Sequence, residues 1–199
     1  MFSFLHEIGE NLAHDRGLGR LHRDIVSGVA RVVGADSTAL YLLDPRNGTV
    51  LVPAALTRDC PAVIELPERL HGESSAALHS YLLLTATPAA EGLLGRCFTS
   101  QAAANTGPLV TGPHWTASLA ASQAGMSVMV APVTTGSRRL GVIAAIQDAG
   151  KEPFTAHEFE VFRSAAEQCA FALASAMTQQ EAMDKRRIEE ELRSASEVQ

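Results

Sequence analysis

Apolar residues recur at the spacing of one helix face in two segments near the start of the chain. The first set is Phe4, Leu5, Ile8 and Leu12. The second set runs from Leu18 to Val33 and stops at Gly34. Because residues three and four apart share one face of a helix, this pattern predicts two amphipathic helices. We expect the first to end at residues 15–17 and the second to span residues 18–33.

Paired apolar runs in the middle of the chain predict two β-hairpins. The first pair flanks Asp44-Pro45-Arg46-Asn47-Gly48, a sequence typical of a turn, and predicts strands near residues 37–43 and 49–56. Pro53 cannot donate a ladder hydrogen bond, so we expect an irregular or edge position there. The second pair flanks a turn around Gly136-Ser137-Arg138-Arg139. Its runs are almost continuously apolar, which predicts a sheet covered on both faces.

The segment between the hairpins predicts short helices and loops. Residues 73–84 and 92–101 have the composition of short helices, and residues 104–115 that of a loop. The whole order is helix, helix, hairpin, short helices, hairpin, long helix. This order predicts an α+β fold with one central antiparallel sheet.

The sequence PFTAHEFEVF, residues 153–162, marks the start of the last helix. Thr155 and Glu158 have the spacing of a capping box, and Phe154 and Phe159 that of a hydrophobic staple. No proline or glycine follows before Gln199. We therefore expect one helix of about 40 residues, which is about 60 Å long. Because a domain of this size cannot cover such a length, its distal half should project.

Composition indicates a globular chain with a well-filled core. Of the 199 residues, 46% are hydrophobic and 19% charged, and the net charge is −6. This acidic balance argues against nucleic-acid binding, which usually requires a basic face. We find neither the features of a signal peptide nor an apolar run of ~18 residues. We therefore expect a cytoplasmic protein with no membrane segment in this chain.

Four segments, in this order, resemble a GAF domain, the small-molecule sensor module of bacterial signalling proteins. They are GVARVVGADSTALYLLDPRNGTV, EGLLGRCFTSQ, SVMVAPVTTGSRRLGVIAAIQD and FTAHEFEVFRSAAEQCAFAL. The resemblance covers about residues 18–176 and implies a GAF/PAS-like α+β fold. It places the terminal helices on one face of the sheet and a possible pocket, under short helices and loops, on the other. It also implies a homodimer through the terminal helices.

The C-terminal sequence RIEEELRSASEVQ is similar to the connector before the serine/threonine phosphatase domain of regulators related to the sporulation phosphatase. Ser194 and Ser196 depart from that pattern, and a connector to a cyclase or kinase can look similar. The resemblance implies three segments. They are an N-terminal packing helix (1–17), a GAF-like sensor domain (18–176) and a helical linker toward an output domain (177–199).

The distal helix offers an incomplete apolar stripe. Its members are Ile188, Leu192, Ala195 and Val198, and residues 179–187 add only Met183. A stable coiled coil sustains apolar a and d positions. A weakly packed signalling rod and a solvated terminal helix both fit this stripe. The aspartates are scattered, whereas two-metal phosphatase chemistry needs clustered carboxylates. We therefore expect no phosphatase activity in this chain, and the leading interpretation is a non-catalytic sensor.

The three cysteines, Cys60, Cys97 and Cys169, are widely spaced. An odd number without a CxxC pair argues against a disulfide framework or a zinc site. Cys169 lies in the apolar stripe of the last helix and is expected in the core. Cys97, next to Arg96, either lines a core or pocket or acts as a reactive thiol. The alternatives to a sensor are therefore a thiol redox enzyme, similar to methionine sulfoxide reductases, and a degenerate GAF dimerisation scaffold.

No cofactor or metal site is expected. Bilin-binding relatives often carry a histidine next to their cysteine, whereas Phe98 follows Cys97 here. The seven histidines form no i,i+4 pair and no HExxH motif. His114 is interpreted as a hydrogen-bonded loop residue rather than a haem ligand. Gln147-Asp148 stands where cyclic-nucleotide-binding relatives carry Asn-Lys, and the lost positive charge argues against such a ligand.

A candidate pocket combines an apolar wall with a few polar side chains, as ligand sites usually do. The candidate lining residues are Tyr41, Leu93, Leu94, Cys97, Phe98, His114, Trp115, Val128 and Gln147. Tyr41, His114 and Gln147 are its polar members. The alternative is that these side chains fill a dry core.

Overall fold

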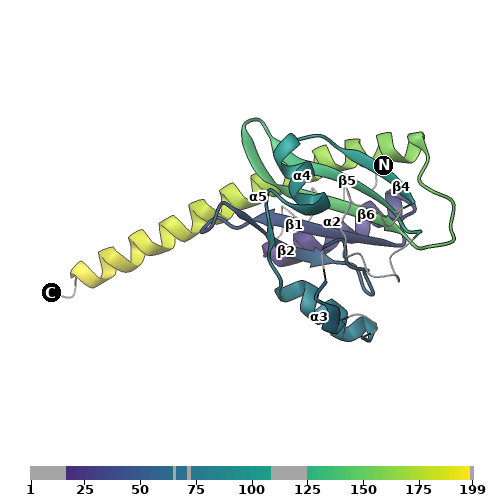
Figure 1. The fold of residues 1–199 in the computed structure, drawn as a ribbon. Coiled ribbons are helices and arrows are strands. Elements are labelled where there is room, and N and C mark those ends of the chain that lie inside the picture. Colours follow the sequence, from purple (N-terminus) through teal and green to yellow (C-terminus); the bar gives the residue numbers. More distant parts are fainter. Residues whose placement is uncertain (1–16, 65, 71–72, 109–124, 198–199) are drawn as a thin grey trace.

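A computed structural model describes residues 17–64, 66–70, 73–108 and 125–197. Its centre is a six-stranded antiparallel sheet with the order β3-β2-β1-β6-β5-β4 (Figure 1). The strands are β1 (Ser37–Leu43), β2 (Val50–Leu56), β3 (Thr87–Pro88), β4 (Ala104–Pro108), β5 (Ser127–Thr135) and β6 (Arg138–Gln147). The helices are α2 (Leu18–Val33), α3 (Ser75–Leu84), α4 (Gly92–Ser100) and α5 (Ala156–Glu197), with the short 3₁₀ helix η1 (Glu68–Leu70). The predicted α+β fold is confirmed, and the predicted N-terminal helix lies outside the described residues.

The sheet separates two hydrophobic cores. On one face, α2 and α5 cover alternate sheet residues such as Ile143 and Ala145. On the other face, α4, part of α3 and the segment after β2 cover Val142, Ala144 and Ile146. Successive side chains of a strand point to opposite faces, so β6 is apolar throughout because both its faces are buried. The predicted covering of both faces is confirmed.

The first helix and hairpin follow the sequence prediction. Helix α2 ends at Gly34, whose φ of +68° is left-handed and whose N–H donates to the Ala30 carbonyl oxygen. Strands β1 and β2 pair antiparallel, and Asp44 Oδ1 accepts a hydrogen bond of 2.8 Å from the Arg46 N–H in the turn. Pro53 pairs with Tyr41 beside a register shift. The expected irregularity at this proline is confirmed.

The second hairpin is the longest pairing in the sheet, from Ser127 opposite Gln147 to Thr135 opposite Arg138. Its turn consists of Gly136 and Ser137, so Arg138 begins β6 rather than lying in the turn as predicted.

The predicted loop at residues 104–115 is wrong in its first part, because Ala104–Pro108 form the edge strand β4. Asn105, Gly107 and Pro108 are poor strand formers, which hides this strand in the sequence. Where the β4–β5 pairing is irregular, a threonine hydroxyl replaces the missing backbone hydrogen-bond partner of Val128. The Thr106 hydroxyl donates to the Val128 carbonyl oxygen at 3.0 Å and accepts from the Val128 N–H at 3.3 Å. The two-residue strand β3 was also not predicted.

The last helix, α5, has 42 residues and begins with the predicted capping box. The Thr155 N–H donates to Glu158 Oε2 at 2.7 Å, and the Glu158 N–H donates to Thr155 Oγ1 at 3.2 Å. Phe154 is buried and Phe159 packs against the same core. The helix leaves the sheet after Met177, and residues 178–193 are exposed (Figure 1). The predicted projection is confirmed. Among the described residues, no helix combines the length and apolarity needed to cross a membrane.

Candidate functional site

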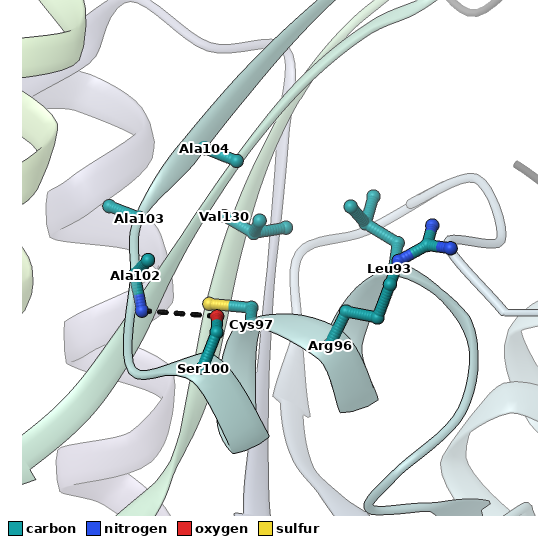
Figure 2. A pocket seen from close by; sticks show the side chains of 8 residues that line it. All are labelled: Leu93, Arg96, Cys97, Ser100, Ala102, Ala103, Ala104 and Val130. Carbon is teal, nitrogen blue, oxygen red and sulfur yellow. Dashed lines mark hydrogen bonds between the residues drawn. The ribbon is translucent and has the colours of Figure 1, made fainter. Parts of the chain in front are cut away.

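A small open pocket lies between α4, the start of β4 and β5 (Figure 2). Its volume is about 210 Å³. The lining residues are Leu93, Arg96, Cys97, Ser100, Ala102, Ala103, Ala104 and Val130. This volume is smaller than the ~300 Å³ at the low end of common ligand sites. The pocket therefore fits a small metabolite or one end of a larger molecule.

One face of α4 forms one wall of the pocket. Leu93, Arg96, Cys97 and Ser100 follow the i, i+3, i+4, i+7 spacing of a single helix face. Helix α4 packs closely on the chain before it at Gly95, where an added Cβ would lie 2.8 Å from the Ala90 carbonyl carbon. A larger residue at Gly95 would therefore push this wall away from its neighbours.

The opposite wall is the chain that returns after α4. Gln101 ends the helix with a left-handed φ of 56°, and its N–H donates to the Cys97 carbonyl oxygen at 2.9 Å. The next residue, Ala102, donates its N–H to Ser100 Oγ at 3.3 Å (Figure 2). The three alanines at 102–104 leave space because their side chains are short. Val130, fully buried on β5, completes the lining.

The lining combines an apolar body with polar groups from α4. Leu93, Cys97 and Val130 are buried, whereas Arg96 and Ser100 are exposed. Arg96 supplies the one full charge among the lining residues. A guanidinium binds carboxylate or phosphate oxygens through paired donors. The pocket is therefore suited to a small molecule with an apolar part and an anionic or acceptor end.

The structure brings only part of the predicted site together. Leu93 and Cys97 line the pocket. Other predicted residues lie in the core on the same face of the sheet, outside the lining, and these are Tyr41, Leu94, Phe98 and Val128. Gln147 is half-buried at the end of β6. His114 and Trp115 lie outside the described residues.

Sequence reasoning missed Arg96, Ser100, the alanines at 102–104 and Val130. The helical spacing from Leu93 would have identified Arg96 and Ser100. The alanines carry no comparable pattern, because a wall made by small side chains is defined only when the chain is folded.

Tyr41 is a buried polar residue beside this region. Its side chain is fully buried, and its hydroxyl makes no hydrogen bond among the described residues. Burial raises the pKa of Tyr41 far above its ordinary value, and the nearby Cys60 adds to the shift. The phenol is therefore neutral at physiological pH, and it belongs to the core rather than to the pocket lining.

The three cysteines are all buried free thiols. Burial raises the pKa of Cys60, Cys97 and Cys169 to about 12 in each case. The thiolate is the reactive form, and reactive cysteines have lowered pKa values and exposed sulfur atoms. These thiols therefore stay protonated at neutral pH. Within the described part of the chain, no three His, Cys, Asp or Glu side chains gather as a metal-binding group.

The projecting part of α5 is a second candidate functional surface. Its exposed large apolar side chains are Met183, Ile188 and Leu192, and Phe171 is exposed on the packed part of the same helix. Ion pairs within the helix join Lys185 to Glu189 at 4.0 Å and Arg187 to Glu191 at 3.5 Å. One contact reaches back to the sheet, where Arg138 Nη2 donates to Glu181 Oε1 at 3.0 Å.

The chain matches the protein family described as GAF domain over residues 18–173. A comparison with curated proteins finds no match. Among solved structures, the GAF-B domain of DevS from Mycobacterium smegmatis is similar, at 23% identity and a TM-score of 0.58. That similarity covers 82% of this chain and 97% of the DevS domain.

Two further structures have the same fold. The GAF domain of a phosphoenolpyruvate-protein phosphotransferase from Coxiella burnetii is 15% identical with a TM-score of 0.66, covering 90% of this chain and 96% of that one. A free methionine-R-sulfoxide reductase from Neisseria meningitidis, in complex with its substrate, is 16% identical with a TM-score of 0.61. That similarity covers 88% of this chain and 89% of the reductase chain. At these identities the likeness shows the fold alone.

Proposed function

Because the chain belongs to the GAF domain family, we propose that it is a non-catalytic sensory module that binds a small molecule beside α4 and relays its binding through α5. The output is a domain of a bacterial signalling protein, for which a PPM-type serine/threonine phosphatase is our leading candidate. The observation that carries this proposal is the shape of α5. Its first part completes the domain core, and its second part leaves the domain with exposed apolar side chains.

A line of side chains along α5, exposed except for the half-buried Ala174, supports pairing with a second copy. Phe171, Ala174, Thr178, Glu181, Lys185, Ile188 and Leu192 follow the alternating three- and four-residue spacing of a and d positions. The line is apolar at both ends and polar at Thr178, Glu181 and Lys185. Polar residues at a and d positions lower coiled-coil stability and specify register. We propose a parallel homodimer whose connector begins near Met177, with its weak centre suited to a change of packing.

The pocket supports sensing over a pure scaffold role. A degenerate scaffold has no need of a charged side chain beside an apolar hollow, whereas a small-molecule site uses both. The thiol redox alternative is less well supported, because all three cysteines are buried and protonated. The similarity to a methionine sulfoxide reductase is a similarity of fold alone and does not imply the same chemistry.

The dimer proposal is tested with charged substitutions on two sides of the projecting helix. Ile188→Asp places a charge in the proposed seam, whereas Met183→Asp places one at a similarly exposed position outside it, since these side chains are 54% and 52% exposed. We expect sedimentation velocity to show a weakened dimer for Ile188→Asp and an unchanged dimer for Met183→Asp. A wild-type monomer, or equal effects of both substitutions, would contradict the proposed seam.

Ligand binding is tested by a metabolite screen on the whole chain, read by thermal shift and followed by calorimetry. We expect a small anionic compound to bind, and Arg96→Ala to reduce its affinity at least tenfold. The matched control is Arg139→Ala, which removes an exposed arginine outside the pocket lining. A ligand whose affinity is unchanged by Arg96→Ala would locate the site elsewhere.

A further inference from the structure

Two side-chain contacts connect α4 to the projecting part of α5 through one hairpin. The Thr134 hydroxyl of β5 donates to Gln101 Oε1 at the end of α4, at 2.5 Å. Arg138 at the start of β6 donates to Glu181 of α5 at 3.0 Å. Thr134 and Arg138 lie on opposite sides of the two-residue turn of the β5–β6 hairpin. The end of this hairpin therefore contacts the end of α4 through Thr134 and the projecting part of α5 through Arg138.

Gln101 is fixed to the pocket wall. Its backbone N–H donates to the Cys97 carbonyl oxygen, and its side-chain Nε2 donates to the Phe98 carbonyl oxygen. Cys97 itself lines the pocket. A displacement of α4 by an occupant of the pocket would therefore move Gln101 and the acceptor that Thr134 uses.

The hairpin is irregular at the same point. The pairing of β5 with β6 shifts its register between Val133 and Thr134. A bulge bends the strand locally and changes the direction of the side chains beyond it. Four residues later along the chain, Arg138 extends to α5. The position of the hairpin end therefore controls whether the Arg138 guanidinium reaches the helix.

Glu181 lies one helical turn beyond Met177, the half-buried residue that precedes the exposed stretch 178–193. Its contact with Arg138 joins side chains that are 44% and 64% exposed. Exposed ion pairs are weak and change a local equilibrium by about 1.5- to 5-fold. Such a pair biases the start of the projecting helix without locking it, as a reversible switch requires.

Glu181 also lies on the a/d line of the proposed dimer. In a parallel, in-register pair, Glu181 of one copy faces Glu181 of the second copy in the same layer of the seam, and two unpaired carboxylates there repel each other. The contact with Arg138 of its own domain therefore offsets this repulsion, and its loss weakens the seam.

We propose that the Gln101–Thr134 and Arg138–Glu181 contacts form a relay from the pocket wall to the helix seam. This inference rests on the proposed sensory function and specifies its regulation. A shift of α4 alters the Thr134 contact, the hairpin end moves, and Glu181, released from Arg138, weakens the seam. Neighbouring contacts do not by themselves show that a change at one contact affects the other. The relay therefore requires a measurement of the energetic coupling between Thr134 and the start of the projecting helix.

The experiment measures backbone amide hydrogen exchange over residues 178–184 in the whole chain, without ligand or output domain. We expect Arg138→Ala and Thr134→Val each to raise exchange about 1.5- to 5-fold, although Thr134 does not contact α5. The double variant should exchange no faster than Arg138→Ala alone, because both changes break one relay. Arg139→Ala, a neighbouring exposed arginine, should leave exchange unchanged. The charge reversal Arg138→Glu with Glu181→Arg should restore the wild-type rate.

The relay is overturned if Thr134→Val leaves residues 178–184 unchanged, or if its effect adds fully to that of Arg138→Ala. The charge-reversed pair keeps the test meaningful, because restored exchange excludes general unfolding as the cause. No step of this experiment depends on a ligand or an output. Failure of the metabolite screen would count against the proposed function and leave the relay result in place.

Discussion

The two parts of α5 belong to one helix but are stabilised in different ways. In the packed part, Phe162 and Leu173 are fully buried between α2 and the sheet. In the projecting part, Ile188 and Leu192 are 54% and 66% exposed, and ion pairs within the helix are its main described contacts. Burial of a large apolar side chain contributes ~1.5–3 kcal/mol, whereas an i,i+4 ion pair contributes ~0.2–0.5 kcal/mol.

The packed part of α5 therefore stabilises the fold, whereas the projecting part is the part proposed to transmit the signal. A change in the packed part alters the stability of the whole domain, whereas a change in the projecting part alters only a local equilibrium. Signalling elements are drawn from regions of low local stability for this reason. If the boundary near Met177 is also a boundary in stability, substitutions on its two sides should differ in their effect on the whole domain.

The largest effect is expected from Phe162→Ala in the packed part. Phe162 is fully buried, and removal of a buried phenylalanine side chain costs about 3–5 kcal/mol of unfolding free energy. The matched control is Met183→Ala in the projecting part and outside the proposed seam, where the side chain is 52% exposed and the cost should stay below ~1 kcal/mol. Urea denaturation of both variants measures the difference. Equal losses would contradict the description of α5 as one buried and one exposed surface.

The next effect is a loss of stability in alkali that involves Cys169. Burial raises the pKa of this thiol from about 9 to about 12 in the folded state. Between these pH values the unfolded chain releases the proton and the folded chain keeps it. Unfolding free energy should therefore fall with rising pH, by up to ~1.4 kcal/mol per pH unit for this thiol, and be unaffected by it below pH ~9.

Cys169→Ala provides the comparison for this pH dependence. The variant should have a flatter fall of unfolding free energy between pH 9 and pH 10.5, measured by urea denaturation at each pH. A slope identical to wild type would show that Cys169 ionises equally in both states.

A smaller effect is expected at the start of α5. Thr155→Ala removes the N-cap hydroxyl and should cost about 1 kcal/mol. The Glu158 carboxylate in turn accepts hydrogen bonds from the Thr155 backbone N–H and hydroxyl, and these lower the pKa of Glu158, with the backbone N–H as the largest cause. The stabilisation is therefore present above the ordinary carboxyl pKa and lost as pH falls through the lowered value. Thermal melts should show a difference between wild type and Thr155→Ala at pH 7 that narrows in acid.

The control for the cap is Thr178→Ala in the projecting part. The Thr178 hydroxyl donates to the Ala174 carbonyl oxygen, which already belongs to the helix. Alanine favours helix more strongly than threonine, so this variant should be neutral or slightly stabilising. A loss similar to that of Thr155→Ala would indicate that the cap has no special role.

Local sequence predicted the elements whose boundaries depend on short-range chemistry. Gly34 ends α2 through its left-handed conformation, and Thr155 with Glu158 begins α5. The length of α5 followed from the absence of breaking residues. The strand β4 was not predictable in this way, because its pairing depends on Thr106 meeting Val128, 22 residues away in sequence.

The pocket was predicted only in part for a related reason. Leu93 and Cys97 were identified because the family resemblance and an apolar helix face agree there. Val130 lines the pocket and Val128 does not, although both lie on the same face of β5. Which of the two valines lines the pocket depends on where α4 crosses the sheet. That crossing point cannot be predicted from the local sequence.

The smallest effect on global stability is expected from Ala182→Gly in the projecting part. Glycine costs a helix about 1 kcal/mol relative to alanine, which should raise amide exchange near residue 182 by about 5-fold. Because residues 178–193 are exposed, the urea midpoint of the domain should not move. The matched change Ala176→Gly, where the alanine packs against the core, should lower that midpoint. Equal midpoint shifts would mean that the projecting helix unfolds together with the core, and the stability boundary near Met177 would not exist.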